Sequence, residues 1–464
     1  MIENNVLFEE MLDLFERRFY TSLVNRLDEL NPVDTAEFLS LLPPDKRPIL
    51  FRLLKKDTAA DVFAELDADV QEAIILAMTD RELTDIIEEL FTDDVIDLLE
   101  EMPAGIVLRI MHSVTPEARA EINRFLAYPA GSAGSVMTSE LIYLKKTMTC
   151  EQAVEKIRRI GLDKETVYLA YVTDSAKHLE GVVPLKKLLF AQPNDLVEDL
   201  MTPNVISAYT HDDRETVAKL ISRYDLFALP ITDKEGRLVG IVTVDDALDV
   251  LEDEATEDME KMAAILPTDK PYMKTGIWET WKKRVPWLLL LMLTATFTST
   301  IMTAYESAIG TYVILSAFIP MLMNTGGNAG SQSSVTIIRG LSLGEIETRD
   351  VLRVLGKEIA VSALCGVTLA AATFFKVMAL DFGFSFQTTL QNGMVQNNLL
   401  IAAVISVTVF FGIVIAKIVG TILPMLTKKL GLDPAVMASP FITTIVDTVT
   451  LIIYFTVASV MLHI

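Results

Sequence analysis

The stretch SPFITTIVDTVTLIIYF, residues 439–455, decides how this chain must fold. It is an apolar run of nearly the ~20 residues that a helix needs to cross a bilayer, and Asp447 is its only charged residue. An ionisable side chain in hydrocarbon costs about 2.5 to 3.5 kcal/mol on insertion scales, so it usually faces a bundle interior or a water-filled path. We therefore expect Asp447 either to be packed and hydrogen-bonded to a neighbouring helix or to line an ion path.

Four more apolar stretches lie between Arg284 and this one, and only sparse charges separate them. Each is long enough, or nearly so, to cross a bilayer as a helix. We therefore predict an α-helical membrane domain over residues 285–464 with five transmembrane helices. They are placed at 285–305, 307–338, near 359–375, within 382–416 and at 434–464.

The loops between these helices differ in positive charge. Lys and Arg gather before the first helix, between the second and third, and between the fourth and fifth, whereas the opposite loops carry only Glu306, Lys376 and Asp381. Lys and Arg accumulate on the cytoplasmic side of membrane proteins. We therefore predict a multi-pass protein of the cell membrane with its N-terminus in the cytoplasm and its C-terminus outside.

The predicted second helix contains NTGGNAGSQSS, residues 324–334. Its small residues, among them Gly327, let helix backbones approach closely, and simple helix packing is one interpretation of the motif. Asn324, Asn328 and Gln332 recur every four residues and so lie on one helical face. A row of amide oxygens there could line an aqueous path.

The ligands that such a path offers are all oxygens. Carboxylates, amides, hydroxyls and backbone carbonyls suit Mg2+, Ca2+ or Mn2+ better than Cu or Zn. Mg2+ often keeps several waters while it is bound through one or two carboxylates. One Asp447 per chain, doubled in a twofold dimer, would fit a mostly hydrated ion, but the residues alone do not separate Mg2+ from its neighbours.

The net charge of -23 lies entirely before the membrane domain, because residues 285–464 hold eight acidic and eight basic side chains. This acidity argues against nucleic acid as a partner and suits cations, although a solvated surface is the ordinary alternative. The two cysteines lie far apart in sequence, which disfavours a disulfide or a thiolate metal site. We find no nucleophile with a base, phosphate loop or zinc signature, so we do not expect an enzyme.

Residues 1–130 contain short amphipathic helical patterns separated by Pro or Asp, as in DRELTDIIEELFTDDVIDLLEEMP, residues 80–103. Their spacing predicts an all-α superhelical N-domain. Asp93 and Asp97 stand one turn apart on the same face, an arrangement that repels unless a cation or solvent intervenes.

A tandem repeat follows over residues 131–251. Each copy begins with Met-Thr, continues with a helix and then contains an apolar strand pattern, GVV at 181–183 or GIV at 240–242. The repeat resembles a CBS-domain pair, an α/β module that commonly dimerises and often binds adenine nucleotides. The resemblance implies regulation and makes ATP a candidate ligand. From Asp245 the chain is densely acidic, which predicts an acidic connecting helix and linker over 246–284, either solvated or bridged by cations.

Taken in order, these parts resemble the MgtE family of Mg2+ channels and transporters. The most specific marks are GGNAGSQ at 326–332, VTVDDALDVLEDEATEDMEKM at 242–262 and DPAVMASPFITTIVD at 433–447. The resemblance implies a homodimer in the lipid bilayer in which Asp447 holds a hydrated Mg2+, with Asn324, Gly327 and Asn328 close by. It also implies regulatory Mg2+ at Asp61, Asp93, Asp97, Glu215, Asp225, Asp246, Asp249, Glu254, Glu257 and Asp258. Thr450 stands where the family often has Gly, which bears on helix packing there.

The sequence therefore predicts a Mg2+-selective channel or transporter for Mg2+ uptake, gated by cytoplasmic Mg2+. Unbridged carboxylates would repel one another and favour an open pore, whereas bridging ions would close it. Two alternatives stay open. One is a transporter of another divalent cation such as Co2+, Ni2+ or Mn2+, and the other is a membrane-anchored nucleotide sensor.

Overall fold

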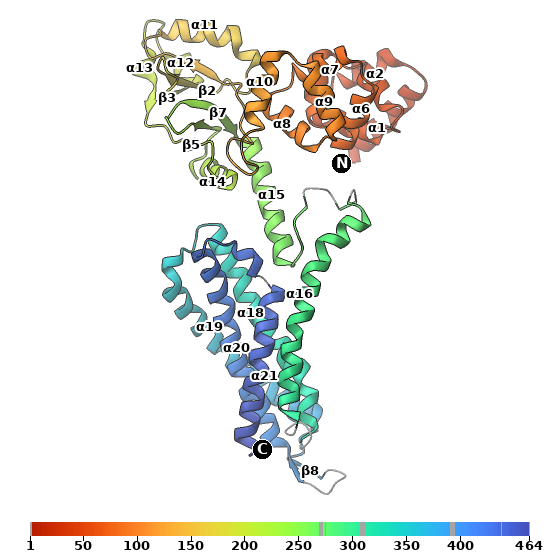
Figure 1. Cartoon of the computed structure of the whole chain (residues 1–464), viewed down its shortest axis with the longest axis vertical. Coiled ribbons are helices and arrows are strands. Elements are labelled where there is room, and N and C mark those ends of the chain that lie inside the picture. Colours follow the sequence, from red (N-terminus) through yellow and green to blue (C-terminus); the bar gives the residue numbers. More distant parts are fainter. Residues whose placement is uncertain are drawn as a thin grey trace. The chain divides into compact units, whose positions relative to one another are not determined.

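The structure is a computed structural model that describes residues 2–268, 272–273, 275–306, 312–389, 395–437 and 439–463. The chain divides into two compact units, the acidic unit (Met1–Glu252) and the membrane unit (Asp253–Ile464). The acidic unit holds short helices and the two larger sheets, and the membrane unit holds long helices (Figure 1). Helix α15 (Val244–Met262) begins in the first unit and ends in the second.

The first part of the acidic unit is helical, as the sequence predicts. Apolar side chains from successive helices, such as those of Leu39, Ile74 and Ile110, are fully buried in one hydrophobic core. This core continues into the second CBS copy through Leu229 and Val242. The helices are α1 (Ile2–Glu16), α2 (Tyr20–Leu27), α3 (Pro32–Leu41), α4 (Arg47–Phe51), α5 (Lys56–Ala64), α6 (Ala68–Ala77), α7 (Asp80–Ile87), α8 (Thr92–Glu101), α9 (Ala104–Ser113) and α10 (Pro116–Phe125).

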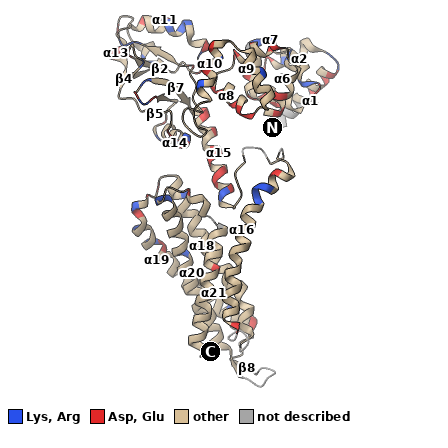
Figure 2. Ribbon diagram, viewed as in Figure 1, with Lys and Arg blue, Asp and Glu red and all other residues tan. Residues whose placement is uncertain are grey.

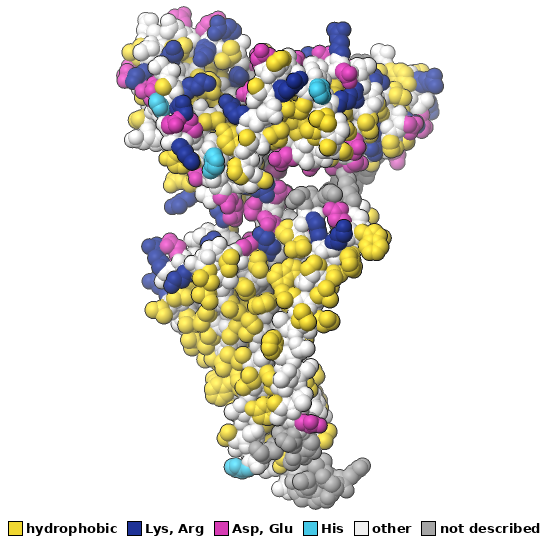
Figure 3. All heavy atoms as spheres, viewed as in Figure 1, with side chains coloured by type: hydrophobic (Ala, Val, Ile, Leu, Met, Phe, Trp, Pro, Cys, Tyr) yellow, Lys and Arg dark blue, Asp and Glu magenta, His cyan; other side chains and the backbone are white. Residues whose placement is uncertain are grey.

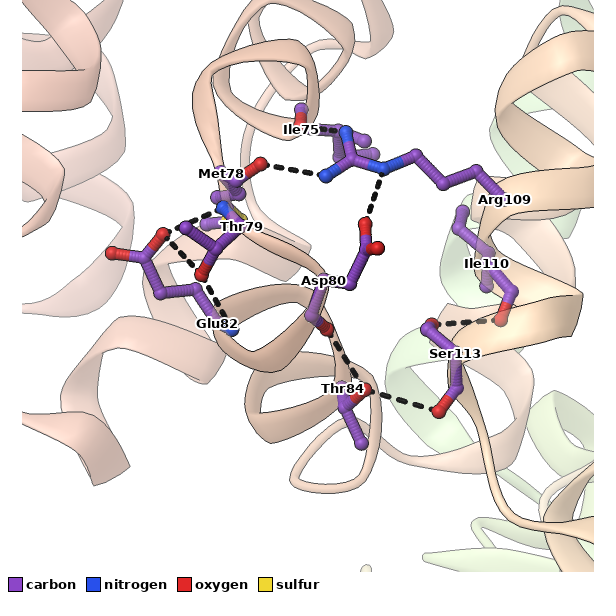
Figure 4. A network of polar contacts seen from close by, with 9 residues as sticks. All are labelled: Ile75, Met78, Thr79, Asp80, Glu82, Thr84, Arg109, Ile110 and Ser113. Atoms are coloured by element: carbon purple, nitrogen blue, oxygen red, sulfur yellow. Dashed lines mark hydrogen bonds and ion pairs between the residues drawn. The ribbon is translucent and has the colours of Figure 1, made fainter.

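Arginine side chains hold several of these helices together at their C-terminal ends. Arg109 on α9 donates from Nη1 to Ile75 O at 2.8 Å and from Nη2 to Met78 O at 2.6 Å (Figure 4). Its Nε donates to Asp80 Oδ1 at 2.9 Å, at the start of α7. The last carbonyls of a helix have no partner within the helix, and a cation there also opposes the helix dipole. One side chain therefore joins α9 to the end of α6 and the start of α7.

Arg109→Ala should lower the free energy of unfolding by about 1 to 3 kcal/mol, because buried acceptors lose a charged donor. Chemical denaturation of residues 1–262 measures the loss. Arg17→Ala is the control, since it removes only an exposed pair with Asp13 and should cost less than about 1 kcal/mol. Equal losses in the two variants would contradict a joining role for Arg109.

The second part of the acidic unit contains two sheets of matching topology, which confirms the predicted repeat. In each copy a short first strand lies parallel to a second strand, which lies antiparallel to a third. A helix connects the two parallel strands, as parallel pairing requires. The first copy comprises β1 (Ile142–Leu144), α11 (Cys150–Ile160), β2 (Leu169–Thr173), β3 (Leu179–Pro184), α12 (Leu185–Phe190), α13 (Val197–Leu200) and β4 (Thr202–Pro203). The second comprises β5 (Ala208–Tyr209), α14 (Arg214–Tyr224), β6 (Ala228–Thr232), β7 (Leu238–Thr243) and α15.

The two copies are joined where the start of the first meets the last strand of the second. Thr138 N donates to Ile241 O at 2.8 Å, and Ile241 N donates to Thr138 O at 2.9 Å. A Cβ atom on Gly240 would lie 2.6 Å from Thr138 O, so only glycine allows this approach. Because this bridge is antiparallel, the segment that follows Thr138 runs back alongside β7.

The membrane unit contains a bundle of long helices and a short hairpin. Its helices are α16 (Ile277–Ala304), α18 (Ile314–Ser342), α19 (Val351–Lys376), α20 (Asn398–Lys429) and α21 (Ser439–Leu462), and its hairpin strands are β8 (Gln387–Thr389) and β9 (Val395–Asn397). Apolar side chains cover much of its visible surface, whereas charged side chains are spread over the acidic unit (Figures 2 and 3). Among the described residues, four helices are long and apolar enough to cross a membrane, namely all of these except α18.

Helix α18 packs among the others despite its polar middle. It lies against α20 and α21, and α19 lies against α20. The Tyr454 hydroxyl on α21 donates to Leu315 O near the start of α18 at 2.9 Å. Helix α16 contacts α21, and Tyr305, directly after α16, stacks on Phe455 with ring centroids 4.7 Å apart. No residue of α16 is buried within the chain.

Each predicted apolar stretch corresponds to one long helix, but several boundaries were wrong. The first helix, α16, already begins at Ile277, before the predicted start at 285. The predicted fourth span, within 382–416, begins too early, because the hairpin precedes α20, and it ends too early, because α20 continues to Lys429. The predicted third span, near 359–375, begins too late, because α19 already starts at Val351. In both cases a charged residue, Lys417 or Glu358, marked the predicted limit, and the structure places both inside their helices.

Candidate functional site

Asp447 lies in the middle of α21, two turns after the helix begins at Ser439. The hydroxyls of Thr444 and Thr448 donate to carbonyl oxygens four residues earlier in the same helix, both at 3.0 Å. Asp447 differs from them. Its side chain is half-buried, and its Oδ1 atom is buried without a hydrogen-bond partner among the residues that the structure describes. The sequence left two possibilities for Asp447: a hydrogen bond to a neighbouring helix, or a place in an ion path. In the described part of the chain, Oδ1 makes no such hydrogen bond.

Glycines on α18 bring that helix close to α21 on both sides of Asp447. A Cβ atom on Gly326 would lie 2.8 Å from Thr450 Oγ1, and one on Gly327 would lie 2.8 Å from Thr443 Cγ2. Thr443 and Thr450 are one turn before and one turn after Asp447. The glycine face of α18 therefore packs on the α21 residues that flank the carboxylate. Thr450 is buried in this contact, so the hydroxyl-bearing side chain is accommodated by a glycine on the facing helix.

The face of α18 next to the glycine face carries the amide row. Asn324, Asn328 and Gln332 are exposed in the single chain, whereas Ala329 and Gly330 between them are buried. Asn328 Nδ2 donates to Asn324 Oδ1 at 3.3 Å, which aligns two of the amides along the helix. One face of α18 is thus used for packing, and the other presents amide groups that this chain leaves uncovered.

In the acidic unit, carboxylates from α8, the loop before β2 and the start of α15 affect one another. Burial, and then the charges of Asp246, Asp94 and Glu165, raise the pKa of Asp93 well above its usual value. Burial and the charge of Asp246 raise the pKa of Asp94 to about 6 and that of Glu165 to about 8. We call Asp93, Asp94, Glu165 and Asp246 the acid cluster. Bringing these groups together in ionised form costs free energy that a proton or a cation would remove.

Hydrogen bonds stabilise part of the negative charge in and around the acid cluster. Asp246 accepts from the backbone N–H and the hydroxyl of Thr243, although burial still raises its pKa. Nearby, Glu140 accepts from the hydroxyls of Thr92 and Thr138 at 2.9 and 2.7 Å, which fixes it at the start of α8. Glu165 Oε2, by contrast, is buried without a hydrogen-bond partner in the described part of the chain.

The sequence named some of these acids and missed others. It singled out Asp93, Asp97 and Asp246. The structure places Asp97 one turn further along α8, where burial and then the charges of Asp94, Glu100 and Asp246 raise its pKa to about 7. It missed Asp94 and Glu165. Asp94 stood directly beside a predicted residue, but Glu165 lies in a loop, and only the tertiary fold brings it to α8.

The other predicted sensor residues are spread over α5, α14 and α15. Glu215 lies in the first turn of α14 and pairs with Lys219, while Asp225 follows the last turn in a left-handed conformation, with φ of 52°. Ten residues of helix separate them by roughly 15 Å, too far to share an ion. Asp61 is exposed on α5, and its charge contributes to the raised pKa of Asp94. Asp249 is exposed on α15, and its pKa is raised by burial and then by Asp245 and Glu252.

The last turns of α15 contact the end of α18 and the residues that precede α21, within the membrane unit. Lys261 Nζ lies 2.7 Å from Asp433 Oδ2, just before α21, and it also pairs with Glu257. Ser342 at the end of α18 donates to Asp258 Oδ2 at 3.2 Å. We call these contacts the α15 latch. The sequence proposed Glu257 and Asp258 as ion ligands, and here both have protein partners, while Glu254 is half-buried one turn earlier.

Within the described residues, no three acidic, histidine or cysteine side chains converge as a ready-made metal site. The fold and both groups of residues define a class: a membrane protein with a tandem α/β repeat and an oxygen-lined polar region in its helical bundle.

The comparisons with known proteins give the family. The model of the MgtE family, described as divalent cation transporters, matches residues 319–457; that of the MgtE intracellular N domain matches 30–131; and that of the CBS domain matches 133–194 and 197–253. The chain is 37% identical over 441 residues to the magnesium transporter MgtE of Thermus thermophilus, covering 94% of each protein. It is 32% identical to the magnesium transporter MgtE of Bacillus subtilis, over 94% of this chain and 93% of the relative. This chain belongs to the MgtE family of divalent cation transporters.

A solved structure agrees with the fold of the acidic unit. The cytosolic domain of the Mg2+ channel MgtE in complex with ATP has a TM-score of 0.50 and 35% sequence identity, over 52% of this chain and 99% of that chain. The resemblance that the sequence indicated, the fold class and the membrane location are thereby confirmed.

The raised pKa values predict how stability depends on pH. A carboxyl whose pKa is higher in the folded state leaves stability intact below its unfolded pKa, near 4.5 for Glu165, and stability falls as pH rises through the folded value of about 8. Without divalent ions, residues 1–262 should therefore unfold at lower temperature at pH 8 than at pH 5. The difference should be on the order of 1 to 2 kcal/mol for each fully titrated carboxyl.

Glu165→Gln should reduce this pH dependence, and Glu155→Gln, an exposed change on α11, should not. Thermal unfolding across pH in the presence of a chelator measures both. If Glu165→Gln leaves the dependence of the unfolding temperature on pH unchanged, the Glu165 carboxyl does not cause that dependence.

Proposed function

We propose that this chain transports Mg2+ into the cytoplasm through a path that Asp447 and the amide row of α18 line between two copies of the chain. The observation that carries the proposal is the buried Asp447 Oδ1 atom, which lacks a partner in the described part of the chain. A carboxylate in a membrane helix normally faces a protein interior or water and is paired there. A passing cation with its water shell would supply the partner that Asp447 Oδ1 lacks among the described residues.

The chemistry of the lining favours a hydrated Mg2+ ion. One carboxylate per chain and a row of amide oxygens are hard ligands, and Mg2+ dehydrates reluctantly. Relatives that are 37% and 32% identical over nearly the whole chain are named as magnesium transporters, which supports the same ion here. Because the family is described as divalent cation transporters, Co2+, Ni2+ and Mn2+ are the competing ions in any test.

A homodimer would complete the path, since the amide row is exposed in one chain. Two Asp447 carboxylates would then face the same axis. The Lys and Arg residues at the start of α16, between α18 and α19 and at the end of α20 support a cytoplasmic N-terminus and an outside C-terminus. The helices in this view conduct an ion; they do not merely anchor a sensor, and no catalytic step is required.

We further propose that cytoplasmic Mg2+ closes the path through the acid cluster and α15. Two unit charges 4 Å apart repel by about 4 kcal/mol at an effective dielectric of 20. Moving a gate from 1:99 to 99:1 takes about 5.5 kcal/mol, so a few bridged carboxylate pairs suffice. The α15 latch supports the connection, because it ties the far end of the same helix to α18 and to the residues just before α21.

ATP is a second proposed ligand of the acidic unit. Tyr168 and Phe227 occupy equivalent positions, just before β2 and β6, and their exposed rings lie 5.9 Å apart with a 30° tilt. Such an aromatic pair offers a face on which a nucleobase can stack. The solved relative that was crystallised with ATP supports this ligand for the CBS pair.

Asp447→Asn should reduce Mg2+ uptake into vesicles that contain only this protein by at least tenfold, because the neutral amide attracts the ion far less. Asp381→Asn, outside the long helices and paired with Lys376, is the control and should keep uptake near normal. Size-exclusion chromatography establishes that both variants fold and assemble. Undiminished uptake by Asp447→Asn would rule out the proposed path.

Mg2+ should protect residues 1–262 from protease, because bridging ions hold acidic segments together. The combined variant Asp93→Asn, Asp97→Asn and Asp246→Asn should lose the Mg2+-dependent part of this protection. Digestion with and without Mg2+ measures it, and Glu155→Gln serves again as a surface control. Protection that still depends on Mg2+ in the triple variant would count against these residues as sensors.

A further inference from the structure

A buried charged network that does not include Asp447 lies among the membrane helices. It joins Lys417 of α20, Glu358 of α19 and Ser333 of α18. Lys417 and Ser333 are 6% and 2% exposed, and the Glu358 side chain is 13% exposed. Nothing in the proposed ion path uses these three residues, and the sequence gave no sign that they meet.

The serine hydroxyl is the centre of the network. It donates to Glu358 Oε2 at 2.7 Å and accepts from Lys417 Nζ at 3.1 Å, while Lys417 Nζ and Glu358 Oε2 are 3.8 Å apart. Both capacities of the hydroxyl are therefore used. Each charge is paired and hydrogen-bonded, which is the condition under which a charge is tolerated in a dry interior. The geometry links three helices at one point.

The network lies next to the closest helix contact in the bundle. A Cβ atom on Gly420 would be 2.3 Å from Gly330 O, and one on Gly330 would be 3.2 Å from Ala416 O. Gly330 precedes Ser333 by one turn on α18, and Gly420 follows Lys417 by one turn on α20. The glycines set how near the two helices lie. The charged network, which is directional, sets their rotation and register.

The rotation of α18 decides where the amide row points. Gln332 of that row directly precedes Ser333, so the two side chains leave the helix about 100° apart. Ser333 is buried toward α19 and α20, and Gln332 is exposed. A turn of α18 that released Ser333 would also move the amides relative to Asp447.

We propose that Lys417, Ser333 and Glu358 are positioning residues that hold the amide row at the spacing that discriminates Mg2+ from larger divalent cations. This inference rests on the proposed ion path. Mg2+ demands near-ideal octahedral geometry, whereas Ca2+ accepts flexible geometry at longer distances. Loosening α18 should therefore admit Ca2+ and leave a conducting protein.

The test compares Mg2+ and Ca2+ uptake by the full-length protein in lipid vesicles. The double variant Glu358→Gln and Lys417→Met removes both charges together at similar volume, a change that often leaves stability intact. It should lower the ratio of Mg2+ to Ca2+ uptake at least threefold. The exchanged pair, Glu358→Lys with Lys417→Glu, should restore most of the ratio, because the serine can bond either arrangement.

The control is Lys376→Met with Asp381→Asn, which removes an ion pair of the same unit that is largely exposed, and it should leave the ratio unchanged. If the double variant fails to assemble, Ser333→Ala decides, since it removes only the bridging hydroxyl and should also lower the ratio. An unaltered ratio in whichever of these variants assembles overturns the inference. Uptake that survives Asp447→Asn overturns the ion path itself, so the two failures are distinguishable.

Discussion

The approach of α18 to its neighbours depends on the absence of side chains at a few glycines. Lipid offers little hydrophobic drive for helix association, so close van der Waals contact and interhelical hydrogen bonds must supply it. The 2.3 Å that a Cβ on Gly420 would leave to Gly330 O is possible for no other residue. Because one face of α18 is committed to this contact, the polar face has only one direction left. Close packing and the amide row are therefore two consequences of the same motif.

A second constraint operates in the acidic unit, where like charges are held together by the fold. Asp93 and Asp94 sit at the start of α8, and their apolar neighbours Val95 and Ile96 are buried in the core. Burial of these residues fixes the helix and, with it, the acids beside them. The cost of keeping several carboxylates ionised there depends on the surrounding solution, which gives the acidic unit a sensitivity to protons and cations that an ordinary solvated surface lacks.

Helix α15 takes part in both the acid cluster and the α15 latch. Asp246 near its start is part of the acid cluster, and Lys261 near its end pairs with Asp433. Helix α15 is continuous between these two residues. The dense acidity that the sequence shows over this helix is thus divided by the fold into one group beside α8 and another beside the membrane helices.

Much of the fold followed from periodicity, and most of what was missed involves residues far apart in the sequence. The repeated GVV and GIV strands and the long apolar stretches are local signals, and the corresponding sheets and helices are present. Lys417 and Glu358 were taken as the ends of spans, because a charge in an apolar run usually marks a boundary; a partner on another helix cannot be seen in a local pattern. Glu165 was missed for the same reason.

The comparison of two carboxylates in the membrane unit shows what distinguishes a structural charge from one available to an ion. Glu358 has a lysine and a serine from two other helices, so its charge is already balanced and it holds the bundle together. Asp447 has threonines on its own helix that bond to the backbone, and glycines on the facing helix that carry no donor side chain. The same helix, α18, thus supplies a hydroxyl to one carboxylate and only glycine surface beside the other. A carboxylate oxygen that the described part of the chain leaves without a partner is the one that a cation from outside can satisfy.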